Sequence, residues 1–123
     1  LLHQAARSGS VELAELLIAK GAEINVQDNK GNTPLLFAVR KNHCDIVKLL
    51  LANGADVETK NEYDVTPLHW AAVAGHKDIA EILLDNGAEA NVTDRRGKTP
   101  LDYATQGDHT EIIEVIKKHG AKE

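Results

Sequence analysis

Six histidines and one cysteine are the residues of this 123-residue chain best suited to bind a metal or attack a substrate. Three of the histidines, His43, His76 and His109, recur at intervals of 33 residues. If the 33-residue segments stack, these rings lie about one segment apart, too far to share a zinc ion whose ligand bonds are about 2 Å long. Cys44 follows His43 directly, but adjacency in sequence does not place a base beside a nucleophile. The spacing therefore predicts structural histidines.

Other signatures of catalysis and cofactor binding are missing from the sequence. There is no HExxH motif, no CxxC motif and no phosphate-binding GxxxxGK[ST] loop. We therefore predict a protein that is not an enzyme, with no catalytic residue, no metal and no cofactor.

Composition limits the class of protein further. Apolar residues make up 42% and charged residues 27% of the chain, as in soluble globular proteins. The length suits one domain, and we expect a monomer without a membrane span. A formal charge of −5 argues against general nucleic-acid affinity. A single cysteine mildly favours an intracellular location, cytoplasmic or nuclear.

The whole sequence is built on a period of 33 residues. Landmarks that recur in phase are Pro34, Pro67 and Pro100, and the Gly-Ala pairs that begin at Gly21, Gly54, Gly87 and Gly120. Such a period predicts a solenoid in which each unit packs on its neighbours. We divide the single domain 1–123 into a shortened unit 1–30, two full units 31–63 and 64–96, and a terminal unit 97–123.

Each unit is expected to contain two short helices and an extended turn. In the second unit Thr33 is placed to be an N-cap, and Pro34 occupies the first helical position. Asn42 ends this helix, because asparagine tolerates a positive φ. The second helix is expected over about residues 45–53. Helices of two to three turns are marginal alone in water, so the units must stabilise one another.

The apolar spacing predicts which side chains face the core. In the helix expected over residues 11–20, we place Leu13, Leu16 and Leu17 inward. Trp70 is expected mainly in the core, with a place on a binding surface as the alternative. The last helix carries charged residues on its outer face, which is typical of a terminal unit and predicts that the stack ends near Glu123.

These motifs resemble the ankyrin repeat family, whose pattern runs G-x-T-P-L-H-x-A-x-x-x-G-H, then an apolar helix, then L-L-x-x-G-A-D-V-N. The segments that match its first half begin at Gly31, Asp64 and Gly97, and those that match its second half begin at Gly21, Gly54 and Gly87. The resemblance covers essentially the whole chain as four repeats, the first shortened. It implies an all-α solenoid of stacked helix-turn-helix units with protruding β-turn or hairpin loops. Tetratricopeptide repeats, of similar period, lack these motifs.

Five positions depart from the family pattern. Leu36 and Asp102 replace its histidine, so we expect the hydrogen bonds of that histidine to the preceding turn to be lost. Asp64 replaces a turn glycine, which should strain or reshape the turn by of order 1 kcal/mol. Asn42 and Asp108 replace the glycine before a histidine.

The resemblance also implies a binding surface, the concave face formed by the turn tips and the exposed side of each first helix. By register, we predict that the partner-binding residues are Arg7, Lys30, Asn32, Arg40, Lys41, Glu62, Tyr63, Val65, Val73, Arg95, Arg96 and Lys98. Seven of the chain's 14 basic residues belong to this set, against one acid. An acidic protein is therefore expected to have a basic recognition face.

An apolar centre within this basic face points to a protein partner. Tyr63, Val65 and Val73 lie in its middle by register, and an apolar centre with a charged rim is typical of protein interfaces. The hypothesis is a non-catalytic interaction module, an adaptor, scaffold or inhibitor, that binds a protein or peptide with acidic and apolar features. One alternative is an anionic ligand, nucleic acid or a lipid headgroup, on the same face. Another is a structural spacer within a longer protein.

Two asparagines add a possible modification. Asn25 and Asn91 occupy the position that asparaginyl hydroxylases modify in some ankyrin repeats. Asparagine is also favoured in turns for its own hydrogen bonds, so both explanations stay open.

Overall fold

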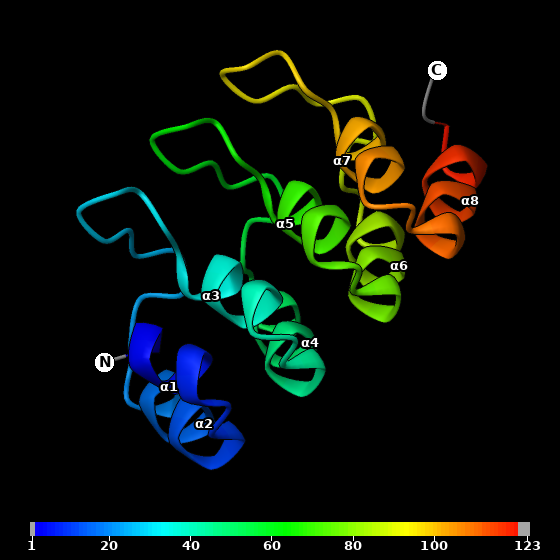
Figure 1. Cartoon of the computed structure of the whole chain (residues 1–123). Coiled ribbons are helices and arrows are strands. Elements are labelled where there is room, and N and C mark those ends of the chain that lie inside the picture. The colour runs from blue at the N-terminus through cyan, green and yellow to red at the C-terminus, as the bar shows by residue number, and fades with distance from the viewer. Residues whose placement is uncertain (1, 121–123) are drawn as a thin grey trace.

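The computed structural model describes residues 2–120, which form eight α-helices and no strand. The helices are α1 (Leu2–Ser8), α2 (Val11–Ala19), α3 (Pro34–Arg40), α4 (Cys44–Ala52), α5 (Pro67–Ala74), α6 (Lys77–Asp85), α7 (Pro100–Gln106) and α8 (Thr110–Lys118). They form four antiparallel pairs that follow one another along the stack, with three loops projecting to the same side (Figure 1). The expected all-α solenoid is confirmed. Leu1 and residues 121–123, which the sequence analysis assigned to the terminal units, lie outside the described residues.

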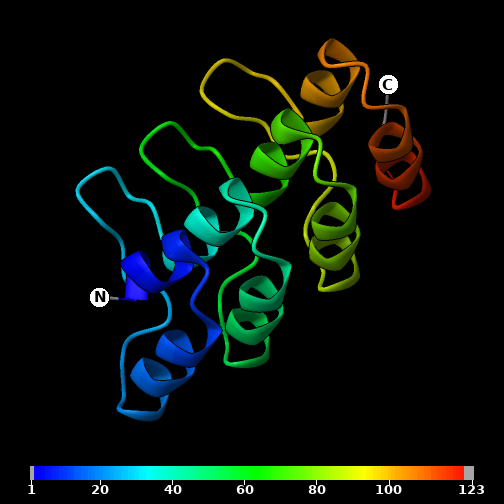
Figure 2. The ribbon, with the colours of Figure 1, turned by 60° about the horizontal axis from the view of Figure 1, so that its bottom comes forward.

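Two rows of helices make the body of the stack. The inner row is α1, α3, α5 and α7, and the outer row is α2, α4, α6 and α8 (Figure 2). Each inner helix packs against the next inner helix and against its own outer partner. Leucine, isoleucine, valine and alanine fill the space between the rows; the largest fully buried aliphatic side chains are Leu35, Leu36, Ile46, Leu50, Leu68, Ile79, Leu83, Ile112 and Ile116.

Threonine caps begin three of the inner helices as expected. The side chains of Thr33, Thr66 and Thr99 each accept a hydrogen bond from the backbone N–H three residues later, at 3.2–3.4 Å. A proline follows each threonine at the first helical position. These caps satisfy backbone groups that short helices cannot satisfy internally.

The residues that replace family glycines adopt the glycine conformation. Asn42 and Asp108 have φ of 61° and 55°, close to the 77° of Gly75 in the same register. Asp64 has φ of 59°, and its turn keeps the backbone hydrogen bond of the other loops, from Asp64 N to Asn61 O at 3.0 Å. The turn is therefore not reshaped, and the expected strain stays in the φ angle, which aspartate and asparagine tolerate better than most residues.

The inward placement of two leucines was wrong. Leu13 is 41% and Leu16 is 52% exposed, whereas Ala14 is fully buried in their place. Residues of the same register as Leu13 in later units, Ile46 and Ile79, are 0% exposed, because the outer helix of the preceding unit packs beside them. Within the described residues no unit precedes α2, so the same apolar pattern leaves this end of the stack uncovered.

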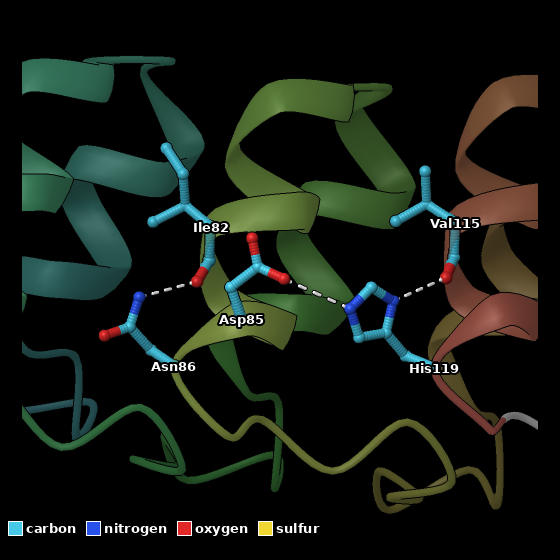
Figure 3. A network of polar contacts seen from close by, with 5 residues as sticks. All are labelled: Ile82, Asp85, Asn86, Val115 and His119. Carbon is cyan, nitrogen blue, oxygen red and sulfur yellow. Dashed lines mark hydrogen bonds and ion pairs between the residues drawn. The ribbon is translucent and has the colours of Figure 1, made fainter.

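The last two outer helices are joined by a polar contact at their carboxyl ends. His119, which follows α8, donates from Nδ1 to the carbonyl of Val115 at 2.9 Å, and its Nε2 lies 3.2 Å from Asp85 Oδ1 (Figure 3). Asn86 Nδ2 donates to the carbonyl of Ile82 at 2.7 Å beside it. Asp85 is largely exposed, so this contact adds little to the free energy of folding compared with the buried core.

Because the preceding unit buries one of two residues of the same register, alanine substitutions at Ile46 and Leu13 should differ greatly in their effect on stability. Ile46→Ala should lower the free energy of unfolding by about 2–5 kcal/mol, because it leaves a cavity between two units. Leu13→Ala should cost less than about 1 kcal/mol, since its side chain already contacts water. Urea unfolding followed by circular dichroism measures both, and equal losses would show that stacking does not decide their contribution.

Candidate functional site

The histidines and the cysteine do not assemble a reactive centre in the described part of the chain. Among residues 2–120, no three His, Cys, Asp or Glu side chains are placed to hold a metal ion. His43 donates from Nε2 to the carbonyl of Arg7 at 3.0 Å, and its ring lies against Gly9, where an added Cβ would come within 2.7 Å. His109 makes the equivalent bond to the carbonyl of Val73 at 3.3 Å. These rings join one unit to the unit before it.

The three projecting loops share one hydrogen-bonding arrangement at their base. A residue with a side-chain acceptor recurs there every 33 positions: Asp28, Asn61 and Asp94. Asn61 Oδ1 accepts hydrogen bonds from the backbone N–H groups of Tyr63 at 2.9 Å and Val65 at 3.1 Å. Asp28 and Asp94 bond the corresponding N–H groups of their own loops. The backbone of each tip is therefore held by its own loop.

Successive loops are also bonded to each other. Glu62 N donates to Lys30 O at 2.9 Å, and Arg95 N donates to Tyr63 O at 3.1 Å. Gln27 Nε2 donates to the carbonyl of Lys60 at 3.3 Å between the same first two loops. The three tips therefore form one continuous row beside the inner helices, and we call the loops and the inner helices together the inner face.

Asp94 is the carboxylate that organises the third loop. It is 8% exposed and accepts hydrogen bonds from the N–H groups of Arg96 and Lys98 and from the hydroxyl of Tyr103. Burial by itself raises the pKa of Asp94, but these hydrogen bonds outweigh it and keep the pKa below its ordinary value. Burial and the neighbouring carboxylate raise the pKa of Tyr103. Asp94 is thus charged at neutral pH, and its oxygens are occupied inside the loop.

A groove of about 550 Å³ lies on the inner face. Its lining comes from the three loops and from α3, α5 and α7: Lys30, Asn32, Arg40, Asn61, Tyr63, Val65, Trp70, Asp94, Arg95, Arg96 and Tyr103. Seven of the twelve residues predicted to bind a partner are among them: Lys30, Asn32, Arg40, Tyr63, Val65, Arg95 and Arg96. The register of the repeat therefore brings most of the predicted set together.

The other five predicted residues lie outside this lining. Arg7, Lys41 and Glu62 are exposed, on α1, after α3 and at the second tip respectively. Val73 is 45% exposed on α5, and Lys98 is partly buried beside a second hollow at α7. Arg7 and Val73 continue the inner face on either side of Arg40 by register.

Two residues of the groove differ from expectation. Asn32 is only 8% exposed, and its Oδ1 accepts a hydrogen bond from Asn61 Nδ2 at 3.2 Å, so it fastens two loops together instead of offering an open polar group. Trp70 is only partly buried: it packs on the core and also lines the groove. Its indole N–H is shielded from solvent and has no hydrogen-bond partner among the described residues.

Two arginines lie over aromatic rings, and the sequence analysis did not predict these contacts. Arg40 Cζ is 4.7 Å from the centroid of the Trp70 ring, and Arg7 Cζ is 4.8 Å from the centroid of the Phe37 ring. Both pairs are separated by the same interval in sequence, so the 33-residue period was the signal that could have revealed them. Cation–π contacts of this kind hold a guanidinium in one place.

Comparison with known proteins decides the family. The model of the family described as ankyrin repeats (3 copies) matches residues 2–94 and again residues 59–123. This chain belongs to the ankyrin repeat family. Ankyrin repeats are generally protein–protein interaction modules and are typically non-catalytic.

Curated relatives share only part of this ankyrin chain. An ankyrin repeat protein of fowlpox virus (strain NVSL) is 48% identical over 42 residues, which is 34% of this chain and 10% of that protein. The mouse fibronectin type 3 and ankyrin repeat domains 1 protein is 46% identical over 43 residues, 35% of this chain and 12% of that protein. The match thus spans about a tenth of either relative. Within residues 2–120, no helix has the length and apolar character to cross a bilayer.

The ankyrin histidine bonds the cap of its own helix and the loop that follows it. His69 donates from Nε2 to the carbonyl of Lys98 at 2.9 Å and accepts at Nδ1 from Thr66 N at 3.1 Å. Asp102, in the same register, keeps the capping half of this arrangement, because its Oδ2 accepts from Thr99 N at 2.9 Å. The expectation that both substitutions lose the bonds to the preceding turn was therefore wrong for Asp102, which keeps the bond to Thr99 N. The bond that the histidine makes to another unit goes to the following loop.

His3 plays the same part in the first ankyrin unit and was missed. Its Nε2 lies 2.9 Å from the carbonyl oxygen of Val26 and 3.0 Å from that of Asn32. The 33-residue spacing that leads back from His69 through Leu36 to His3 was the available signal. Leu36 fills the register as a fully buried core residue with no polar side-chain atom.

The asparagines considered for hydroxylation are engaged in contacts between units. Asn25 Nδ2 donates to the carbonyl of Gly54 at 3.3 Å, and its Oδ1 accepts from Asp56 N at 2.8 Å. Asn91 Nδ2 donates to the carbonyl of Gly120 at 3.2 Å. These bonds account for asparagine at both positions, and hydroxylation stays a prediction.

The buried His69 predicts that stability falls in mild acid. Burial is the largest influence on the pKa of His69 and lowers it below the ordinary value of 6.5. Below about pH 6.5 the unfolded chain therefore binds more protons than the folded chain. The contribution of His69 to the free energy of unfolding is complete above this pH and decreases as the pH falls below it. A His69→Gln variant should be less stable at pH 7.5 and should lose this part of the pH dependence, as urea unfolding between pH 7.5 and 5.5 will measure. A variant with the same slope as the parent chain would exclude His69 as the source.

Proposed function

We propose that this ankyrin chain is a non-catalytic adaptor, scaffold or inhibitor that binds a protein or peptide with acidic and apolar features on its inner face. The observation that carries the proposal is the charge of the groove. Lys30, Arg40, Arg95 and Arg96 line it. Among the described residues of its lining, the one carboxylate is that of Asp94, and its oxygens are occupied inside its own loop. The groove is thus basic on a chain whose formal charge is −5.

An aromatic anchor supplies the apolar part of this surface. Tyr63 is 53% exposed, yet its N–H and C=O are both held by hydrogen bonds within the row of loops. A hydrogen bond to the neighbouring Glu62 and the negative charge of this residue raise the pKa of Tyr63, so the phenol is still harder to ionise than an ordinary tyrosine. Exposed tyrosine in a basic rim is the combination that dominates many protein interfaces.

The arrangement of the loops lowers the cost of binding. The tips are bonded at their base and to one another, so a partner does not have to order them. Immobilising one flexible side chain on binding costs about 0.5–1.5 kcal/mol, and loop ordering adds to this cost. A row of loops that is already ordered supports a role in recognition.

A nucleic acid or a lipid headgroup on the same basic face is the competing ligand class. Phosphate contacts need cations but no exposed tyrosine, so the apolar centre and the negative net charge favour a protein. A Tyr63→Ala substitution separates the classes, because binding through phosphate alone should not change. A spacer role, in which the face binds nothing, is the third possibility.

Affinity capture from cell lysate tests the proposal. The triple variant Tyr63→Ala, Arg40→Glu, Arg96→Glu should lose specific partners, because it removes the anchor and reverses charge at two exposed positions. A matched control, Leu16→Ala, Lys20→Glu, Lys48→Glu, makes the same kind of change at exposed residues of the outer helices and the turn after α2. Mass spectrometry identifies the captured proteins, and circular dichroism checks that both variants fold.

The outcomes are distinct. Partners retained by the control and lost by the triple variant support binding on the inner face. A capture list that is unchanged in the triple variant, or lost only in the control, would contradict the site and move it to the outer helices.

A further inference from the structure

The two arginine–aromatic pairs form successive steps of one ladder on the inner face. Arg7 and Arg40 lie in the last turns of α1 and α3, and each guanidinium lies over an aromatic ring of the next inner helix. The ring beneath Arg7 is Phe37, and the ring beneath Arg40 is Trp70. Because both pairs share the 33-residue register, one step of the stack separates the two guanidinium groups.

Stacking prepares each guanidinium for a carboxylate. The ring covers one face of the planar group, while the N–H donors at its edge stay open. Both arginines are exposed, and among the residues that the structure describes neither guanidinium forms an ion pair or donates a hydrogen bond. A carboxylate can then bind two of these donors side by side, the strongest geometry for this pair of groups.

The third step of the ladder has a different character. Val73 and Tyr103 occupy the registers of Arg40 and Trp70 one unit later. Val73 is 45% exposed and cannot pair with an acid, whereas Lys98 Nζ lies 5.9 Å from the centroid of the Tyr103 ring. The surface therefore presents a cation at Arg7, a second cation at Arg40 and an apolar side chain at Val73, in this order along the stack.

We propose that the inner face recognises an extended acidic peptide segment that crosses the inner helices with one side chain per step. Two carboxylates would bind Arg7 and Arg40, and an apolar side chain would pack on Val73. This rests on the proposed function and specifies its partner. Packed helices are about 8–10 Å apart. An extended segment in the polyproline II conformation rises about 3.1 Å per residue with three residues per turn, so every third side chain points to the same face and three residues span one step. The expected segment has an acid, a second acid three residues on, and an apolar residue three residues beyond, in either chain direction.

Synthetic peptides with different acid spacing test this ladder. The probe is a labelled glycine- and serine-rich peptide with two glutamates three positions apart and a leucine three positions further, made in both directions. One control has the same composition with adjacent glutamates, and another is a helix-forming peptide with spacings of about seven residues, which also span about 10 Å. Fluorescence anisotropy at low salt gives the affinities. The probe in one direction should bind about tenfold tighter than either control.

Charge-conserving variants identify the residues responsible. Arg7→Lys with Arg40→Lys keeps the net charge but removes the planar group that stacks and binds a carboxylate with two bonds. This double variant should bind the probe about tenfold more weakly and lose the preference for spacing. Lys48→Arg, on the exposed side of α4, is the matched control and should bind as the parent chain does.

Any of four results would overturn the ladder. They are equal binding of the probe and the adjacent-glutamate control, tighter binding of the helical peptide, an unchanged spacing preference in the double lysine variant, and failure of the probe to bind in both directions. None of these results would affect partner capture through Tyr63, Arg40 and Arg96, so the proposed function and the ladder can fail separately.

Discussion

Packing between neighbouring units is the interaction on which the rest of the structure depends. Each described helix has seven to nine residues, which is too short to be stable alone in water. Ile46, Ile79 and Ile112 are at most 1% exposed because an outer helix of the unit before each of them packs beside them. Leu13, in the same register, is exposed where the described residues contain no preceding unit. Contacts between units therefore contribute more to the stability of the fold than any one helix does by itself.

The same repetition creates the binding surface. Because the units are related by one step, the acceptors at the loop bases align, and so do the guanidinium groups of Arg7 and Arg40. Rigidity of the inner face is thus a consequence of the stack, and specificity comes from the few positions at which units differ. Val73, in the register of Arg7 and Arg40, is one such position. The chain combines a uniform framework with a surface that changes from cationic to apolar along its length.

The sequence predicted features that depend on one unit and missed features that depend on two. The cap at Thr33 and the positive φ of Asn42 follow from local chemistry, and both are confirmed. The burial of Asn32 arises from its bond to Asn61 in the next loop, which no local pattern shows. Leu16 has the spacing of a core residue, but its exposure depends on what packs beside α2. Trp70 was expected mainly in the core with the binding surface as the alternative, and it both packs on the core and lines the groove.

The most direct test of a rigid inner binding face is hydrogen–deuterium exchange of the chain, free and bound to a protein recovered by capture. In the free chain, the N–H groups of Val65 and Lys98, held by Asn61 and Asp94, should already exchange slowly for loop residues. On binding, further protection should appear at the loop tips and in α3 and α5, with α4 and α6 unchanged. Protection confined to the outer helices, or loops that exchange freely until the partner binds, would contradict the account.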